Sequence, residues 1–173
     1  ASALDEVKDR KESESLFLRG ELLRSLGRLH LVSGQFQESE QTLDESLASF
    51  RRFGDPHSEA ATRVDLGRLA LARGELARAE TMLEEALTTF RRLGDPHSEA
   101  ITLRELGAVC RGRGELARAE TWIEEALAAF RRLGEPRSEA IILRELGNLA
   151  HGRGELARAE TTLQEALAIF RRL

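Results

Sequence analysis

The sequence predicts an all-α fold in which antiparallel helix pairs stack into a solenoid. Ala, Leu, Glu, Arg and Lys, the strongest helix formers, make up 102 of the 173 residues, while Tyr is absent and Pro occurs three times. The chain also repeats itself every 40 residues, since 27 of the 40 residues in 55–94 recur in 95–134. A unit of this size cannot bury its own apolar face, so the units are expected to stack against one another.

The period divides the chain into four repeats, which follow a charged N-terminal extension over residues 1–14. The extension is expected to prolong the first helix or to fray. The first repeat has diverged most, but its glycines keep the register of the others. The predicted repeats cover residues 15–54, 55–94, 95–134 and 135–173.

Each repeat is predicted to contain two helices, A and B. The run Gly94-Asp95-Pro96 ends one helix and begins the next, because Gly accepts the left-handed conformation, Asp caps a helix start and Pro suits the first turn. In the second repeat, helix A is therefore expected over 56–73 and helix B over 75–93. The apolar residues of helix B follow a spacing of three and four, which predicts one buried stripe. They are Leu76, Ala79, Leu83, Ala86, Leu87 and Phe90.

Small residues recur at fixed distances from a Leu-Gly pair in each repeat. After Leu66-Gly67, Ala79 follows the glycine by 12 residues and Ala86 comes seven later. This pattern closely resembles the tetratricopeptide repeat over residues 15–173, although the usual period of that family is about 34 residues and its Trp and Tyr positions on helix A hold other residues here. Repeats with a longer period resemble those of kinesin light chains, G-protein-signalling modulators and bacterial signalling or transcription regulators. The resemblance implies a right-handed superhelix whose helices A line a concave groove that binds a protein or peptide.

The sequence argues against an enzyme. Asp95, His97 and Ser98 have the residue types of a catalytic triad, but the same residues stand at another helix start 40 positions earlier, which favours capping. Cys110 occupies a position that is Ala in two other repeats, so we expect a small buried residue. No catalytic residue, cofactor or metal ion is predicted.

The residues that differ most between repeats lie on helix A, at the positions expected to face the groove. Guanidinium groups there favour a carboxylate or phosphate, so the predicted partner is an acidic peptide or a C-terminal carboxylate. The Arg144 and Asn148 pair resembles, with Arg for Lys, the basic-plus-Asn pair by which some family members grip a peptide carboxylate. The predicted ligand-binding residues are Arg24, Arg28, Arg68, Arg104, Arg111, Arg144, Asn148 and His151.

A second interpretation of these arginines stays open. Asp65, Glu105 and Glu145 follow directly on helix A and are placed to pair with Arg104 and Arg144 between neighbouring repeats. A solvated ladder of this kind would contribute about 0–1 kcal/mol per exposed pair. The sequence alone does not choose between a ladder and a ligand-gripping basic patch.

The last repeat is more apolar than the others. Ile142 stands where two other repeats have Thr, and Ile169 stands where they have Thr or Ala. A surface of this kind marks an interaction site. Two explanations are open: the chain is cut from a longer array, or it forms a homodimer through Ile142 and Ile169.

Charge and composition narrow the class of protein and its compartment. The net charge of −4 argues against nucleic acid as a partner. No apolar run is long enough for a membrane span, and the charged first residues argue against a signal peptide. The single cysteine fits a reducing compartment, so a cytoplasmic location is expected. Arg outnumbers Lys by 24 to 2, which hints at a GC-rich bacterial genome, and the missing initiator Met suggests a fragment.

These observations predict a non-enzymatic protein-binding or peptide-binding scaffold. The expected context is the sensor or docking arm of a larger cytoplasmic regulator. A structural module that self-associates through the last repeat is the alternative. The high identity between repeats would also suit an engineered array, whereas the diverged first repeat favours a natural one.

Overall fold

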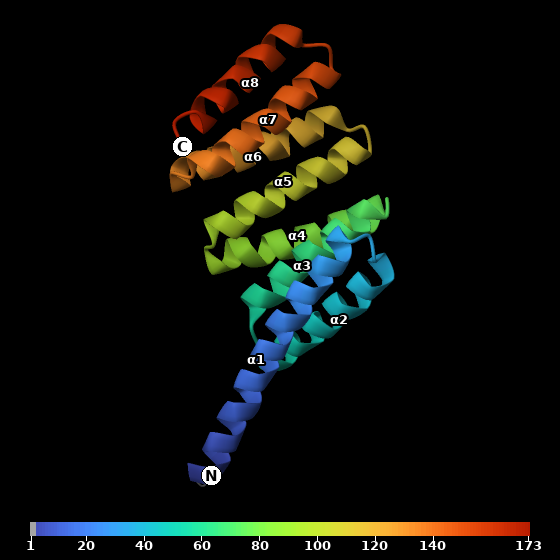
Figure 1. The fold of residues 1–173 in the computed structure, drawn as a ribbon, viewed down its shortest axis with the longest axis vertical. Helices are drawn as coiled ribbons and strands as arrows, with labels where there is room; N and C mark the ends of the chain where they lie inside the picture. Colours follow the sequence, from blue (N-terminus) through green and yellow to red (C-terminus); the bar gives the residue numbers. More distant parts are fainter. Residues whose placement is uncertain (1–2) are drawn as a thin grey trace. The chain divides into compact units, whose positions relative to one another are not determined.

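The computed structural model describes residues 3–173, with side chains for residue 12 and residues 14–173, and this part of the chain forms eight α-helices (Figure 1). The chain divides into two compact units, Ala1–Thr89 and Phe90–Leu173. The boundary falls near the end of the fourth helix. The helices are α1 (Ala3–Val32), α2 (Phe36–Phe53), α3 (Pro56–Ala72), α4 (Leu76–Leu93), α5 (Pro96–Gly112), α6 (Leu116–Leu133), α7 (Pro136–Gly152) and α8 (Leu156–Phe170).

The helix boundaries confirm the predicted pairs to within one residue in the second repeat. The Asp95 carboxylate accepts hydrogen bonds from the backbone N–H groups of His97 and Ser98, both at 3.1 Å, and therefore caps α5 as predicted. Gly94 has a φ of +67°, the left-handed conformation that ends the preceding helix. The predicted helix start at Asp95 and the predicted helix end at Gly94 are therefore confirmed.

In the first unit, α1 packs on α2 and α2 packs on α3. The small residues of α2 let α1 and α2 approach each other closely. The hydroxyl groups of Ser39 and Ser46 on α2 donate to the backbone carbonyls of Gly27 and Gly20 on α1, respectively, both at 2.8 Å. Phe50 fills the space beneath these contacts and is fully buried.

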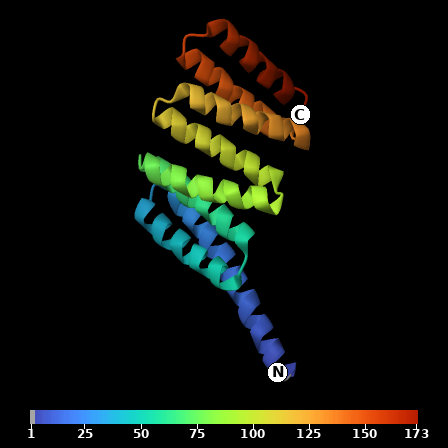
Figure 2. The ribbon, with the colours of Figure 1, turned by 180° about the vertical axis from the view of Figure 1, so that it is seen from behind.

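The second unit follows the same plan in α5, α6, α7 and α8 (Figure 2). A Cβ atom on Gly107 of α5 would lie 2.5 Å from Cγ1 of Ile123 on α6, so only glycine fits at this crossing. Cys110 is buried, as predicted, and Trp122 on α6 is half-buried. None of the described helices is both long enough and apolar enough to cross a membrane.

Candidate functional site

In the first unit, two of the predicted ligand-binding residues meet on one carboxylate. Asp65 of α3 is 1% exposed. Its Oδ2 lies 2.8 Å from Nε of Arg24 on α1, and its Oδ1 lies 3.1 Å from a terminal nitrogen of Arg68 on its own helix. Arg24 and Arg68 thus neutralise the buried carboxylate of Asp65. Arg28 is exposed and forms no ion pair with a described residue.

In the second unit, Arg104 of α5 makes the corresponding contact with the next repeat. Its Nε lies 3.8 Å from Oε1 of Glu145 on α7, and a terminal nitrogen donates to Oε1 of Glu105 at 2.6 Å. Arg104 and Arg24 occupy the same position of the repeat, 80 residues apart. Arg104 thus makes the contact between repeats that the ladder interpretation expects, whereas Arg144 forms no ion pair with a described residue.

Four predicted residues remain on the surface of α5 and α7. Arg111, Arg144, Asn148 and His151 are all exposed. Neither Arg111 nor Arg144 forms an ion pair with another residue in the described part of the chain. The i, i+4, i+7 spacing of Arg144, Asn148 and His151 places these three side chains on one face of α7.

The charges of three arginines act on a partly buried carboxylate on this face. Burial raises the pKa of Glu145, the nearby charges of Arg104, Arg111 and Arg144 lower it, and the carboxylate of Glu105 raises it further. The net result is a raised pKa, so the desolvation of Glu145 is not fully offset by the arginines. Three guanidinium groups here face two carboxylates, and two of them, those of Arg111 and Arg144, form no ion pair with a described residue. We call Arg104, Arg111, Arg144 and Asn148 the arginine face.

Glu145→Gln is expected to make the chain more stable at neutral pH. Because the folded-state pKa is raised, the folded chain retains a proton that the unfolded chain loses, so stability falls as pH rises from 4.5 through the raised pKa. The glutamine variant escapes this loss. The gain in the free energy of unfolding of the Glu145→Gln variant over the parent should be present above the raised pKa and vanish below pH 4.5. Urea unfolding from about pH 4 to about pH 8 measures this difference.

Glu59→Gln is the matched control, with the opposite sign. Burial raises the pKa of Glu59, but hydrogen bonds from Arg51 and Arg63 at 2.8 and 2.7 Å, together with their charges, lower it below its ordinary value. That variant should lose stability at neutral pH and match the parent in acid. A Glu145→Gln variant that is less stable than the parent at neutral pH would contradict the burial argument.

The prediction that Ile142 contributes to an exposed apolar surface is wrong. Ile142 on α7 is 1% exposed and therefore belongs to the interior of the second unit. Ile169 is half-buried. The apolar side chains that α8 does expose are Leu156, Leu167 and Phe170.

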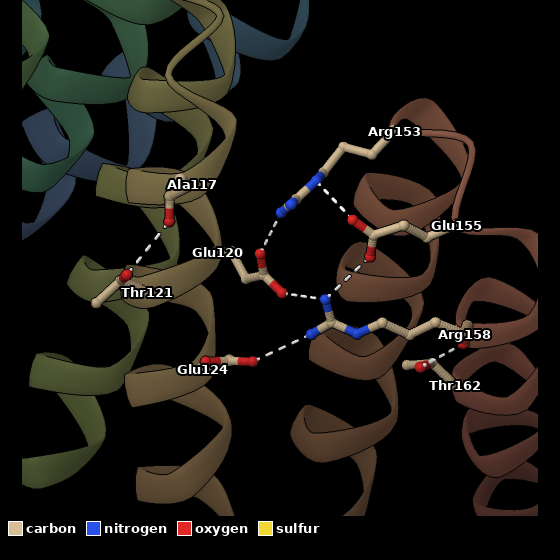
Figure 3. Close-up of polar contacts among 8 residues, drawn as sticks. All are labelled: Ala117, Glu120, Thr121, Glu124, Arg153, Glu155, Arg158 and Thr162. Carbon is tan, nitrogen blue, oxygen red and sulfur yellow. Dashed lines mark hydrogen bonds and ion pairs between the residues drawn. The ribbon is translucent and has the colours of Figure 1, made fainter.

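A second polar contact between repeats was not predicted. In Figure 3, Glu120 of α6 lies between Arg153 and Arg158, which come from the turn before α8 and from α8 itself. Arg153 approaches Glu120 at 2.5 Å, and both arginines also contact Glu155. Glu40 of the first unit makes the same pair of contacts, with Arg73 at 2.5 Å and with Arg78 at 2.6 Å. The 40-residue recurrence of these residues was the available sequence signal.

Comparison with known proteins identifies the repeat. The model of the MalT-like TPR region matches residues 58–173, and that of the tetratricopeptide repeat matches residues 10–92. None of the curated proteins matches the sequence. Both matches agree with the helix-pair architecture and with the small residues at the helix crossings.

Solved structures show the same fold at low sequence identity. BtubC (BKLC) from P. vanneervenii is similar over 100% of this chain and 76% of its own, with a TM-score of 0.80 and 23% identity. A putative kinesin light chain of Podosopora anserina with nearly identical TPR-like repeats is similar over 85% of this chain and 72% of its own, with a TM-score of 0.68 and 21% identity.

The TPR sensor protein PH0952 of Pyrococcus horikoshii, a signal transduction ATPase with numerous domains, is similar over 90% of this chain but 24% of its own, with a TM-score of 0.78 and 17% identity. At these identities the likeness shows the fold. The family itself is shown by the sequence models, one of which spans more than half of the chain. The chain therefore belongs to the tetratricopeptide-repeat family, in its MalT-like form.

Proposed function

We propose that this chain is a non-enzymatic scaffold that binds an acidic peptide, or a peptide's C-terminal carboxylate, on the arginine face of the second unit. Tetratricopeptide repeats are scaffolds typical of protein–protein interaction and of signalling regulators. The observation that carries the proposal is the exposure of Arg111 and Arg144 beside Arg104, where neither forms an ion pair with any side chain that the structure describes. A carboxylate offers two oxygens that match the fork of a guanidinium group.

Asn148 adds a neutral donor to the same face. It follows Arg144 by one helical turn on α7, and both side chains are exposed. A peptide carboxylate between them would accept hydrogen bonds from both. By contrast, Arg24 and Arg68 are excluded from this role in the first unit because Asp65 already occupies them.

The biological setting that we propose is the sensor or docking arm of a larger bacterial regulator in the cytoplasm. The similarity to a protein whose TPR part is described as a sensor supports this setting. So do the single buried cysteine, which suits a reducing compartment, and the excess of Arg over Lys.

Arg111→Glu with Arg144→Glu is expected to weaken binding of an acidic peptide by tenfold or more. Each charge-assisted hydrogen bond contributes about 1.5–3 kcal/mol, and about 1.4 kcal/mol is tenfold in affinity. The probe is a panel of acidic peptides with a free or an amidated C-terminus, followed by fluorescence anisotropy. Affinity should also fall with added salt.

Arg132→Glu supplies the matched control, because Arg132 is exposed on α6, away from the arginine face. Arg132→Glu changes the net charge in the same direction as each test substitution. A control with two such substitutions, one on α6 and one on α8, would match the charge change of the double variant. If the control and test variants weaken peptide binding equally, the loss of affinity comes from the overall charge of the chain and not from the arginine face. Binding that is unchanged by Arg111→Glu with Arg144→Glu would refute the proposed site.

A second candidate function is self-association through the end of the last repeat. The exposed side chains of Leu167 and Phe170 favour it, with Ile169 half-buried beside them. Light scattering over a dilution series distinguishes a monomeric chain from a self-associated one. A mass that stays at 19.3 kDa contradicts self-association, and a mass that doubles with concentration supports it.

A further inference from the structure

The helix α1 exposes an apolar face in its C-terminal half, which we call the α1 face. Leu22 and Val32 are 72% and 87% exposed, although both are large apolar side chains. A hollow of about 580 Å³ lies over the first part of this face, along residues 14–26. An exposed apolar surface of this kind marks an interaction site. The α1 face consists of Leu18, Leu22, Leu26, Leu29 and Val32.

The α1 face differs in residue size from the same positions of the other repeats. In α3, the equivalents of Leu18 and Leu22 are Ser58 and Thr62, which are both buried. The third repeat also has Ser and Thr at these positions. Leucine is larger than either residue, and extra methylene groups at a closely packed helix crossing force the helices apart. The first repeat therefore lacks the small side chains that these buried positions carry in the next repeat.

Three charged residues that contact the preceding repeat are also replaced in the first repeat. The contacts in the first unit are Arg51 with Glu59 at 2.8 Å, Arg24 with Asp65 at 2.8 Å and Glu40 with Arg78 at 2.6 Å. In the first repeat, the position of Glu59 holds Arg19, that of Asp65 holds Ser25 and that of Arg78 holds Glu38. A preceding repeat of the same kind would bring an arginine towards Arg19 and a glutamate towards Glu38. Like-charge pairs across an interface suppress the wrong partner.

The chain also enters the first repeat in a different way. Every later helix A follows a glycine in the left-handed conformation, which is Gly54, Gly94 or Gly134. The equivalent residue is Glu14, which lies inside α1, and Figure 1 shows this helix extending past α2 and α3. Whatever residues precede Ala1, the α1 face is therefore not built to stack another repeat of this kind.

The exposed side chains of the α1 face follow the spacing of a coiled-coil seam. Positions 18, 22, 25, 29 and 32 are separated alternately by four and three residues, and all except Ser25 are Leu or Val. Glu21 and Arg28 stand directly before the seam positions 22 and 29, where coiled coils carry the charges that choose the partner. Arg28 is exposed, Glu21 is half-buried, and neither forms an ion pair with a described residue. The seam is thus flanked by one acid and one base that are available to another helix.

We propose that the α1 face binds the α1 face of a second copy of this chain, with the two helices antiparallel. In this arrangement Leu18 of each copy lies opposite Leu29 of the other, and Glu21 of each copy lies opposite Arg28 of the other. The twofold axis makes both contacts occur twice. A second copy is the occupant because the charges beside this face answer one another when the helix meets itself. The arginine face and the exposed side chains of α8 take no part.

The charges select both the register and the direction of this pair. Shifting the antiparallel helices by one heptad brings Arg28 opposite Arg28 or Glu21 opposite Glu21, which places like charges together. In a parallel pair, Glu21 and Arg28 would face Leu26 and Ser33 and would stay unpaired. The antiparallel register through Leu18 and Leu29 is therefore the one in which both flanking charges are answered.

Sedimentation equilibrium of the full chain should give a mass that rises with concentration from 19.3 kDa towards twice that value. Leu22→Glu should weaken the association by about tenfold or more, because it brings a charge into the seam from both copies. The variant should keep its fold, since Leu22 is mostly exposed in the single chain, and circular dichroism checks this. Leu167→Glu, at an exposed apolar position of α8, is the matched control and should leave the association unchanged.

Charge reversal tests the proposed register. Glu21→Arg alone and Arg28→Glu alone each place like charges in both flanking pairs, so each should weaken the association by about tenfold. The double variant exchanges the two charges and should restore the association of the parent. A mixture of the two single variants should associate more tightly than either variant alone. Arg132→Glu, exposed on α6, is the charge control and should have no effect.

Three outcomes would overturn the proposal. They are a mass that stays at 19.3 kDa at every concentration, an association that Leu167→Glu weakens and Leu22→Glu does not, and a double charge variant that associates no better than the single ones. A doubled mass by itself does not distinguish α1 from α8, so the two leucine variants decide between them. Binding of acidic peptides to the arginine face should be the same in Leu22→Glu and the parent, so this proposal and the proposed function can fail separately.

Discussion

Phe130→Ala is expected to lower the free energy of unfolding by about 3–5 kcal/mol, the largest loss predicted for a single side chain here. Phe130 lies on α6 and is 3% exposed. Removing its ring deletes buried apolar area and leaves a cavity that the packed helices can only partly close. Urea unfolding followed by circular dichroism measures the loss, with the slope of the transition checked for two-state behaviour.

Phe170→Ala is the control within the same chain. Phe170 stands at the equivalent position of the last repeat but is 44% exposed, because no helix covers it among the described residues. Truncation there should cost less than about 1 kcal/mol, as for ordinary surface positions. Equal losses for the two variants would show that Phe170 is covered in solution, which would contradict its exposed fraction of 44%.

Gly107→Ala is expected to destabilise the chain by about 1–3 kcal/mol, although alanine is ordinarily the better helix former by about 1 kcal/mol. The added methyl group would lie 2.5 Å from Cγ1 of Ile123 and 3.3 Å from the carbonyl oxygen of Ala119. Side-chain movement can relieve the first contact, but the second involves the backbone of α6. The helices must therefore move apart at their closest approach. Thermal unfolding reports the net effect.

Two further variants separate crowding from helix propensity. Gly152→Ala places the same methyl group in α7 where nothing lies within 4 Å, so it should be neutral or stabilising. Ile123→Ala removes the crowded neighbour, so Gly107→Ala should cost much less in that background. If Gly107→Ala stabilises the chain as Gly152→Ala does, the close helix crossing is not required.

The repeat and its helices could be read from the sequence because their signals are local and recur. Asp95 caps a helix because its carboxylate accepts from backbone N–H groups two and three residues later, and Gly94 ends a helix through its own left-handed backbone. Both signals depend little on the rest of the fold. The small residues at the crossings, such as Gly107, are likewise fixed by direct neighbours.

The error at Ile142 has a different origin. Apolar character alone does not tell whether a helix A position faces the preceding repeat or the solvent. The burial of Thr62 and Thr102, its polar equivalents, shows that this position is interior in earlier repeats. The exposed large apolar side chains of the fourth repeat instead lie on helix B, where Leu167 and Phe170 keep the residue types of buried positions.

The pairing of the charged residues could be predicted only in part. With 24 arginines and 24 glutamates in the chain, many pairs are sterically reachable, and the choice depends on side-chain geometry. The ladder through Arg104 and Glu145 was one of two open interpretations, and the clamp of Arg153 and Arg158 on Glu120 was missed. These contacts matter for function because they determine which arginines remain available.

The central claim, that the arginine face binds a peptide carboxylate, is tested most directly by nuclear magnetic resonance. An acidic peptide with a free C-terminus is titrated into isotope-labelled chain while the amide and side-chain signals are followed. We expect the largest shifts at Arg111, Arg144 and Asn148, and much smaller shifts with the amidated peptide. Shifts confined to the outer helices α6 and α8, or equal shifts with both peptides, would contradict the claim.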